Sequence, residues 1–156
     1  MNRRQVLTAA FASLTVPFHF WELAAAPVRH LAATSETGTQ VETLFRKDLP
    51  DLARGDNTAS LSVLRVLYAP GGESRSHTHP VPAFVYVLRG VVESQVEGEM
   101  TRRYGAGEYF FEEAGHRHLL ARNASSTESA EFLTIFVGKA NLPLTIPVSD
   151  QNRTPR

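Results

Sequence analysis

The stretch "PGGESRSHTHPVPAFVYVLRG", residues 70–90, decides the fold of this chain and most of its expected function. It opens with the turn sequence Pro-Gly-Gly, continues with two histidines one residue apart, His77 and His79, and ends in a β-rich run closed by Gly90. On a strand, residues two apart point to the same face, so this pair can direct both imidazoles to one point. Neutral imidazole is the commonest protein ligand of divalent transition metals. The stretch therefore predicts either half of a metal site or two polar residues in a solvated loop.

A second H-x-H pair, His116 and His118, lies in "GEYFFEEAGHRHLLARN", residues 107–123, and also follows a glycine-rich turn. The chain has no cysteine, so any metal site must be built from histidine, carboxylate or amide ligands. Two such pairs among short strands favour a metal site over solvated loops. A phosphate-binding loop is not indicated, because Gly71-Gly72 lack the following Lys-Ser/Thr.

Taken together, the two stretches resemble the two sequence motifs of the cupin family. The residues that match the motifs are Gly71, His77, His79 and Gly90 in the first, and Gly107, Gly115, His118 and Asn123 in the second. The resemblance extends over residues 41–148, and it implies an all-β fold, a double-stranded β-helix (jelly-roll) barrel. Cupins of this single-domain type are often homodimers, so the resemblance also implies a homodimer.

The chain departs from the family's motifs at three positions. Counting back from Gly90, the family's metal-binding glutamate falls at position 83, where this chain has Ala83. Glu113 stands where the second motif has proline, and Arg122 precedes Asn123. The resemblance therefore implies a site with three ligands, His77, His79 and His118.

His116 is a candidate extra ligand, because it has the same strand parity as His118. An exposed turn residue is the alternative interpretation of this histidine.

A site of three imidazoles leaves the charge of a divalent ion unneutralised and lacks the hard oxygen ligand that suits Mn or Mg. We expect a divalent transition metal, with Fe first and Zn, Ni, Cu or Mn as alternatives. Three protein ligands leave coordination positions open, as in catalytic sites. The predicted function is a dioxygenase-like oxidoreductase that acts on a small enol, diketone or aromatic hydroxy compound. The alternatives are a non-catalytic module that binds a small molecule or a metal, and an empty dimerising scaffold.

Three further residues are candidates for substrate binding. Parity from Ala83 directs Val85 and Val87 inward, which gives the pocket an apolar floor. Arg75, just before the first H-x-H, can meet an anionic substrate by charge-assisted hydrogen bonds, or it is a solvated loop residue. Phe84 and Tyr86 have the opposite parity and are expected to pack against the second sheet or a dimer partner.

The rest of the chain favours one all-β domain. Short β-rich runs are separated by regular glycine-rich turns, and no segment after the N-terminus predicts a helix of three turns. The chain has 156 residues, of which 42% are hydrophobic, and this length suits a single domain. Its 16 Lys+Arg balance 16 Asp+Glu, so nucleic acid is not an expected partner.

The N-terminus, "MNRRQVLTAAFASLTVPFHFWELAAAP", has the layout of a twin-arginine (Tat) export signal, with Arg3-Arg4, an apolar stretch and the small-residue run 24–26. It predicts a periplasmic or secreted protein, whereas a retained amphipathic helix is the alternative. Pro17 and Glu22 interrupt the apolar stretch, so no stable membrane span is expected. The predicted organisation is an export signal (1–26), a linker (27–40), the barrel (41–148) and a flexible tail (149–156).

Overall fold

The computed structural model describes residues 33–34, 38–55 and 57–148. All the secondary-structure elements of these residues are β-strands. The predicted export signal, much of the predicted linker and the tail lie outside the described residues. No described helix is long and apolar enough to cross a bilayer. The strands are β1 (Ala33–Thr34), β2 (Thr39–Arg54), β3 (Asn57–Tyr68), β4 (Glu73–Ser74), β5 (His77–Thr78), β6 (Ala83–Arg89), β7 (Val91–Val96), β8 (Arg102–Gly105), β9 (Tyr109–Glu112), β10 (Arg117–Asn123), β11 (Ala130–Lys139) and β12 (Ile146–Pro147).

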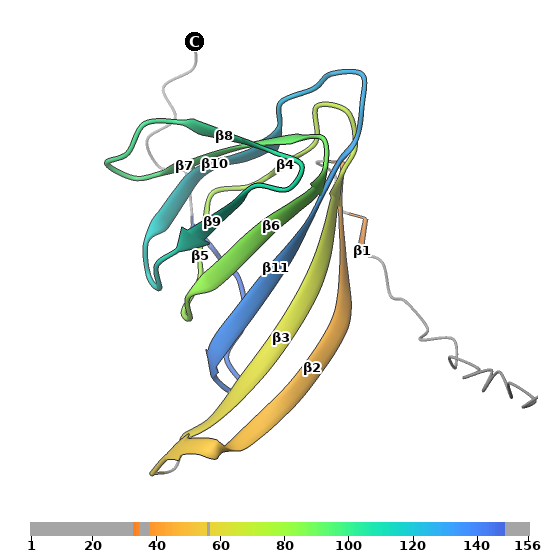
Figure 1. The fold of residues 1–156 in the computed structure, drawn as a ribbon. Helices are drawn as coiled ribbons and strands as arrows, with labels where there is room; N and C mark the ends of the chain where they lie inside the picture. The colour runs from red at the N-terminus through yellow and green to blue at the C-terminus, as the bar shows by residue number, and fades with distance from the viewer. Residues whose placement is uncertain (1–32, 35–37, 56, 149–156) are drawn as a thin grey trace, which may run out of the picture.

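The strands form two antiparallel sheets (Figure 1). The first sheet has the order β1-β2-β3-β11-β6-β9, and the second has the order β12-β5-β10-β7-β8, with β4 also paired to β10. Neighbours such as β3 and β11 are far apart in sequence, because the chain passes repeatedly from one sheet to the other, as in a jelly roll. The prediction of an all-β jelly-roll barrel is confirmed.

Strand β2 is longer than the sequence pattern suggests. The pattern predicts a strand that ends at Pro50, but β2 begins at Thr39 and runs to Arg54, and it pairs with β3 to form the long hairpin in Figure 1. Its other neighbour, β1, pairs only with residues 40–41, so the segment around Pro50 is an edge. Proline is tolerated on an edge strand because no ladder partner needs its missing N–H.

Gly90 turns the chain from β6 in the first sheet to β7 in the second. Its φ is 75°, and a Cβ at this position would lie 2.7 Å from the carbonyl oxygen of Ser129. Both the left-handed backbone and the close approach require glycine here. This turn therefore carries the chain from the first sheet to the second, so that the inward-facing residues of β6 face those of β7.

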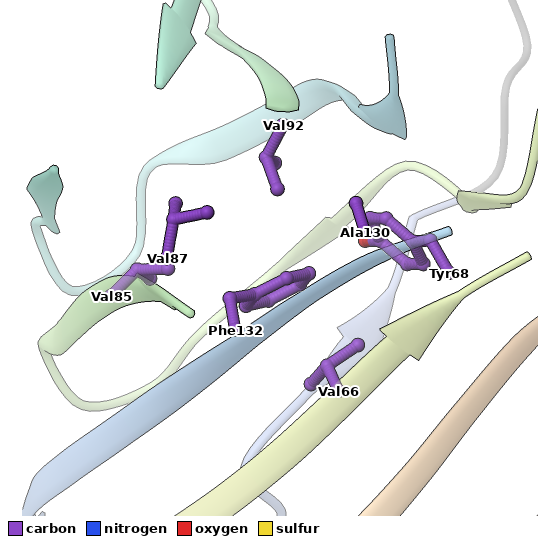
Figure 2. Close-up of a cluster of buried hydrophobic side chains, with 7 residues drawn as sticks. All are labelled: Val66, Tyr68, Val85, Val87, Val92, Ala130 and Phe132. Atoms are coloured by element: carbon purple, nitrogen blue, oxygen red, sulfur yellow. The ribbon is translucent and has the colours of Figure 1, made fainter. Parts of the chain in front are cut away.

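The main core lies between the sheets, and its members are Val66, Tyr68, Val85, Val87, Val92, Ala130 and Phe132 (Figure 2). Val92 comes from the second sheet and the other six from the first. Each fully buried valine or phenylalanine contributes about 1.5–3 kcal/mol. Along β6, buried and more exposed residues alternate, which confirms the predicted inward parity of Val85 and Val87. Phe84, on the opposite face, stacks on Tyr109 of β9.

Candidate metal centre

The three predicted ligands lie together inside the barrel. His77 in β5 pairs directly with His118 in β10, and His79 follows the end of β5. The ring centroids are 4.8 Å apart for His77 and His79, 5.1 Å for His77 and His118, and 5.2 Å for His79 and His118. All three side chains are buried.

Glu112, at the end of β9, joins this group. Its Oε2 lies 3.2 Å from His79 Nε2, and its Oε1 lies 3.2 Å from His118 Nδ1. His79, Glu112 and His118 each offer one ligand atom, and these atoms all lie within 4.8 Å of one another. The expectation that the three histidines stand without a carboxylate is therefore wrong.

The register of β6 and β9 explains how the carboxylate reaches the site. Ala83, at the position of the family's glutamate, is the direct cross-strand partner of Glu112. Directly opposed residues of an antiparallel pair project to the same face, about 4.5–5.5 Å apart at Cβ. Glu112 thus enters the barrel beside the place that a glutamate at position 83 would occupy.

Sequence reasoning missed Glu112 because the motif gives ligand positions along the chain, whereas this carboxylate comes from a neighbouring strand. One signal was available, since Phe110 and Glu112 share parity within a β-rich run. The face that they share relative to Ala83 depends on strand register, which spacing alone does not supply.

Two backbone carbonyls orient two of the histidines. His77 Nδ1 lies 2.6 Å from the Arg75 carbonyl oxygen, and His79 Nδ1 lies 2.6 Å from the Leu144 carbonyl oxygen. Because a carbonyl oxygen only accepts, each Nδ1 carries a hydrogen and donates it, which leaves Nε2 as the nitrogen that can face a metal ion. Such hydrogen bonds fix the tautomer and ring orientation of metal-binding histidines.

His118 is the most deeply buried of the three, at 1% exposure. Neither of its ring nitrogens has a hydrogen-bond partner in the described part of the chain, and the approach of Nδ1 to Glu112 lacks hydrogen-bond geometry. Burial lowers the pKa of His118 to about 4 and also lowers the pKa of His77, so both imidazoles are neutral ligands near pH 7. Orphaned buried nitrogens call for an explanation, such as an ion. Three imidazoles and a carboxylate fit a divalent transition metal.

The C-terminal segment supports the site along one edge of the second sheet, where β12 pairs with β5. It contributes the Leu144 carbonyl, and β12 pairs Pro147 with His77. The backbone N–H of Val148 donates to the Ser76 carbonyl, and the Ser76 hydroxyl donates to the His118 carbonyl. Two of the three histidines are therefore held in part by residues 144–148.

A cavity of about 630 Å³ opens beside the histidines and Glu112. This volume lies within the range of small-molecule sites, and most of the wall is apolar. The apolar residues from both sheets include Val66, Val85, Val92, Phe110 and Phe132.

The other predicted site residues fall into two groups. Val85 lines the cavity, and so does the exposed Arg75. Val87 is buried in the core and is not part of the wall. His116 is exposed in the turn before β10, and strand geometry begins only at Arg117. Among the described residues, the group whose ligand atoms all lie within 4.8 Å of one another is His79, Glu112 and His118, which includes neither His116 nor His77.

Comparisons with known proteins agree with this fold. A family model described as "Cupin domain" matches residues 64–136. A germin-like protein, subfamily 2 member 2, from Arabidopsis thaliana is 34% identical over 99 residues, which are 59% of this chain and 45% of that protein. The chain thus spans less than half the length of this curated relative.

Two solved structures show the same architecture. A cupin-2 domain from Rhodospirillum rubrum has a TM-score of 0.58 at 17% identity, and the match covers 78% of this chain and 76% of that one. A cupin-like protein from Thermotoga maritima has a TM-score of 0.58 at 22% identity, with 80% and 89% covered.

Proposed function

This chain is a small cupin-domain protein, and on that premise we propose that it is a dioxygenase-like oxidoreductase that holds one divalent transition metal, with iron as the first expectation. The substrate is a small enol, diketone or aromatic hydroxy compound. The observation that carries the proposal is His118: a fully buried imidazole with no hydrogen-bond partner among the described residues, which faces two oriented histidines and a carboxylate.

In this proposal His77, His79, His118 and Glu112 hold the ion, which supplies Lewis acidity and one-electron chemistry toward dioxygen when bound. The Arg75 and Leu144 carbonyls keep the Nε2 atoms of two histidines directed into the site. The mainly apolar wall of the cavity limits the access of water and orients the substrate, and an oxygen atom of the substrate turns toward the histidines.

The test begins with metal content. The protein is purified without chelator or nickel-affinity steps, and bound metals are measured by elemental mass spectrometry in the wild type and in the His77→Ala/His118→Ala variant. We expect about one equivalent of a single transition metal in the wild type and its loss in the variant. Oxygen uptake is then measured with enols, 1,3-diketones and catechols. Metal content that is equal in both proteins contradicts the proposal.

A non-catalytic binding module is the second candidate, and the size and apolar wall of the cavity favour it. Such a module retains its ligand and metal but shows no oxygen uptake above that of the metal-free protein. Native mass spectrometry of the freshly purified protein, with the oxygen electrode, separates the two functions.

We also propose that the protein is a homodimer that buries the outer face of the first sheet. One row of directly paired residues crosses five strands of that face and is apolar throughout: Phe111, Phe84, Ile135, Val63 and Phe45. Phe111 is 57% exposed and Phe45 is 46% exposed. Burial of such a patch favours association. Sedimentation of the wild type as a dimer and of Phe111→Lys as a monomer is expected, and a wild-type monomer contradicts this assembly.

We propose that the N-terminal export signal directs the folded, metal-loaded barrel to the periplasm or to the exterior of the cell. The support is the Arg3-Arg4 pair and the apolar stretch after it. Arg3→Lys/Arg4→Lys is expected to retain the protein in the cytoplasm of a host with the twin-arginine system, as seen by cell fractionation. Unchanged export of this variant contradicts the proposal.

A further inference from the structure

A pair of hydroxyls, from the buried Tyr68 and the half-buried Ser74, lies in the cavity wall away from the histidines. The Tyr68 hydroxyl and Ser74 Oγ are 2.7 Å apart, and both residues line the cavity. Tyr68 is 1% exposed, and its ring is held edge-on against Phe132, with centroids 5.1 Å apart (Figure 2). The position of this hydroxyl is therefore fixed by packing as well as by its hydrogen bond.

The pair has one hydrogen-bond donor to spare. Two hydroxyls joined by one hydrogen bond use one of their two O–H groups. In the described part of the chain, neither oxygen has another hydrogen-bond partner. Burial raises the pKa of Tyr68, so its hydroxyl stays protonated and keeps its donor at neutral pH. A bound acceptor would give this spare donor a hydrogen bond in a partly desolvated place.

The register of β10 gives the distance between the two polar ends of the cavity. His77 pairs with His118, whereas Ser74 pairs with Ala121, three residues further along the same strand. At a rise of about 3.3 Å per residue, the two ends are roughly 10 Å apart. The wall of the cavity is mainly apolar and includes Val85, Phe110 and Phe132. Aromatic side chains in such a wall favour flat, unsaturated ligands.

We infer that the cavity binds a flat apolar ligand the size of two fused rings, anchored by an anionic or enol oxygen at the histidines and by a hydrogen-bond acceptor at the Tyr68–Ser74 pair. This inference rests on the proposed function, because the first anchor is the metal. It makes Tyr68 and Ser74 specificity-determining residues, and neither belongs to the metal-binding group. Ligands that lack the second oxygen still fit the cavity, but they leave the spare donor unpaired.

The test uses two matched probes, 2-naphthoate and 6-hydroxy-2-naphthoate, which differ only in the oxygen at the end remote from the carboxylate. Their dissociation constants are measured by calorimetry on protein loaded with Zn²⁺, which has no redox chemistry. We expect the wild type to prefer the hydroxylated probe by about tenfold, the value of one hydrogen bond in a buried site. The Tyr68→Phe/Ser74→Ala variant is expected to lose this preference and to bind 2-naphthoate as the wild type does.

Ser62→Ala is the matched control, since Ser62 is a buried serine of the same strand as Tyr68 and does not line the cavity. It should keep the preference. An equal preference in the wild type and the double variant overturns the inference, and so does binding of neither probe. Zinc content is measured on the same samples. If the protein holds one equivalent of zinc but shows no preference between the probes, the inference is refuted and the proposed metal site stands. If the protein prefers the hydroxylated probe without holding zinc, the metal site alone is refuted.

Discussion

At the scale of single residues, the carboxylate of Glu112 determines what the three histidines can hold. In the proposed metal site it would neutralise one charge of a divalent ion and add a hard oxygen to three nitrogen ligands. The expected bias of an all-nitrogen site toward Zn, Ni and Cu is therefore weaker, and Mn becomes a closer competitor of Fe. Because Glu112 approaches both His79 and His118, it also links two histidines that come from separate segments.

Glu112→Gln tests this role while preserving the volume of the side chain. The amide keeps an oxygen but loses the negative charge, so the affinity for Mn²⁺ or Fe²⁺ is expected to fall by at least about 100-fold, because even the loss of a partner that only supports a ligand costs up to that much. Competition with a chromophoric chelator measures the change. Glu113→Gln, at the exposed neighbouring position, is the control and should bind as the wild type does. Equal affinities of all three proteins would show that Glu112 is not a ligand.

A second glutamate, Glu93, has a structural role. It is 4% exposed on β7, and it accepts hydrogen bonds from Arg122 Nε at 2.5 Å and Arg103 Nε at 2.7 Å. Arg122, which departs from the family's motif, thus joins β10 to β7. The hydrogen bond from Arg122, followed by that from Arg103, lowers the pKa of Glu93 below its ordinary value of 4.5, although its burial acts in the opposite direction.

The direction of this pKa shift predicts how the free energy of unfolding changes in acid. Because the folded state lowers the pKa, the stabilisation is complete above about pH 4.5 and is lost as the pH falls through the folded value. Glu93→Gln should reduce the free energy of unfolding by about 1–3 kcal/mol at pH 7. The gap to the wild type should close as the pH drops below 4.5. Urea unfolding from pH 7 to pH 3 measures it, with the exposed Glu97→Gln as control. A gap that does not depend on pH contradicts the assignment.

At the scale of strands, the β6–β9 pair brings a carboxylate into the site from the strand next to the one that the family's motif predicts. Ala83 is fully buried beside Val81 and Phe136, so a glutamate at position 83 would press on these neighbours and on the adjacent Glu112. The small residue at 83 and the carboxylate at 112 are thus complementary. The motif, followed along the chain, shows only that position 83 lacks a carboxylate, whereas the strand pair shows that Glu112 lies directly beside that position.

Exchanging the two residues tests this interpretation. Glu112→Ala is expected to weaken metal binding by about 100-fold, and Ala83→Glu/Glu112→Ala should recover most of the loss, because total volume and the number of carboxylates are restored. Ala83→Glu alone should lower the melting temperature, since it overfills the core and brings two carboxylates together. Chelator competition and thermal unfolding measure these outcomes. If the exchanged variant binds metal no better than Glu112→Ala, the two positions are not equivalent.

At the scale of the whole molecule, the fold was predictable because two glycine-bounded motifs and the alternation of β6 both carry local signals. His77, His79 and His118 were predictable for the same reason, since strand parity and motif spacing are local. Glu112, the Leu144 carbonyl and the Tyr68–Ser74 pair were not, because each depends on long-range pairing. The prediction for His116 shows the limit of reasoning from strand parity, because parity predicts the direction of a side chain only where the backbone is extended.

The metal also has a consequence for the stability of the entire barrel. Its proposed ligands come from both sheets, since Glu112 ends β9 in the first sheet while His77 and His118 belong to β5 and β10 in the second. An ion bound to all of these ligands would link the two sheets. It would bind only the folded state, because folding brings the ligands together. At a free metal concentration 100 times the dissociation constant, it should add about 2.7 kcal/mol to the free energy of unfolding.

For a barrel of this size, that gain corresponds to a rise in melting temperature of about 10 °C. Scanning calorimetry after chelator treatment, and again after addition of Mn²⁺ or Zn²⁺, measures it. His118→Ala/Glu112→Gln is the control, because it keeps the fold's other contacts but should show no metal-dependent shift. A wild-type melting temperature that is the same with and without metal would mean that the cluster does not bind an ion across the two sheets.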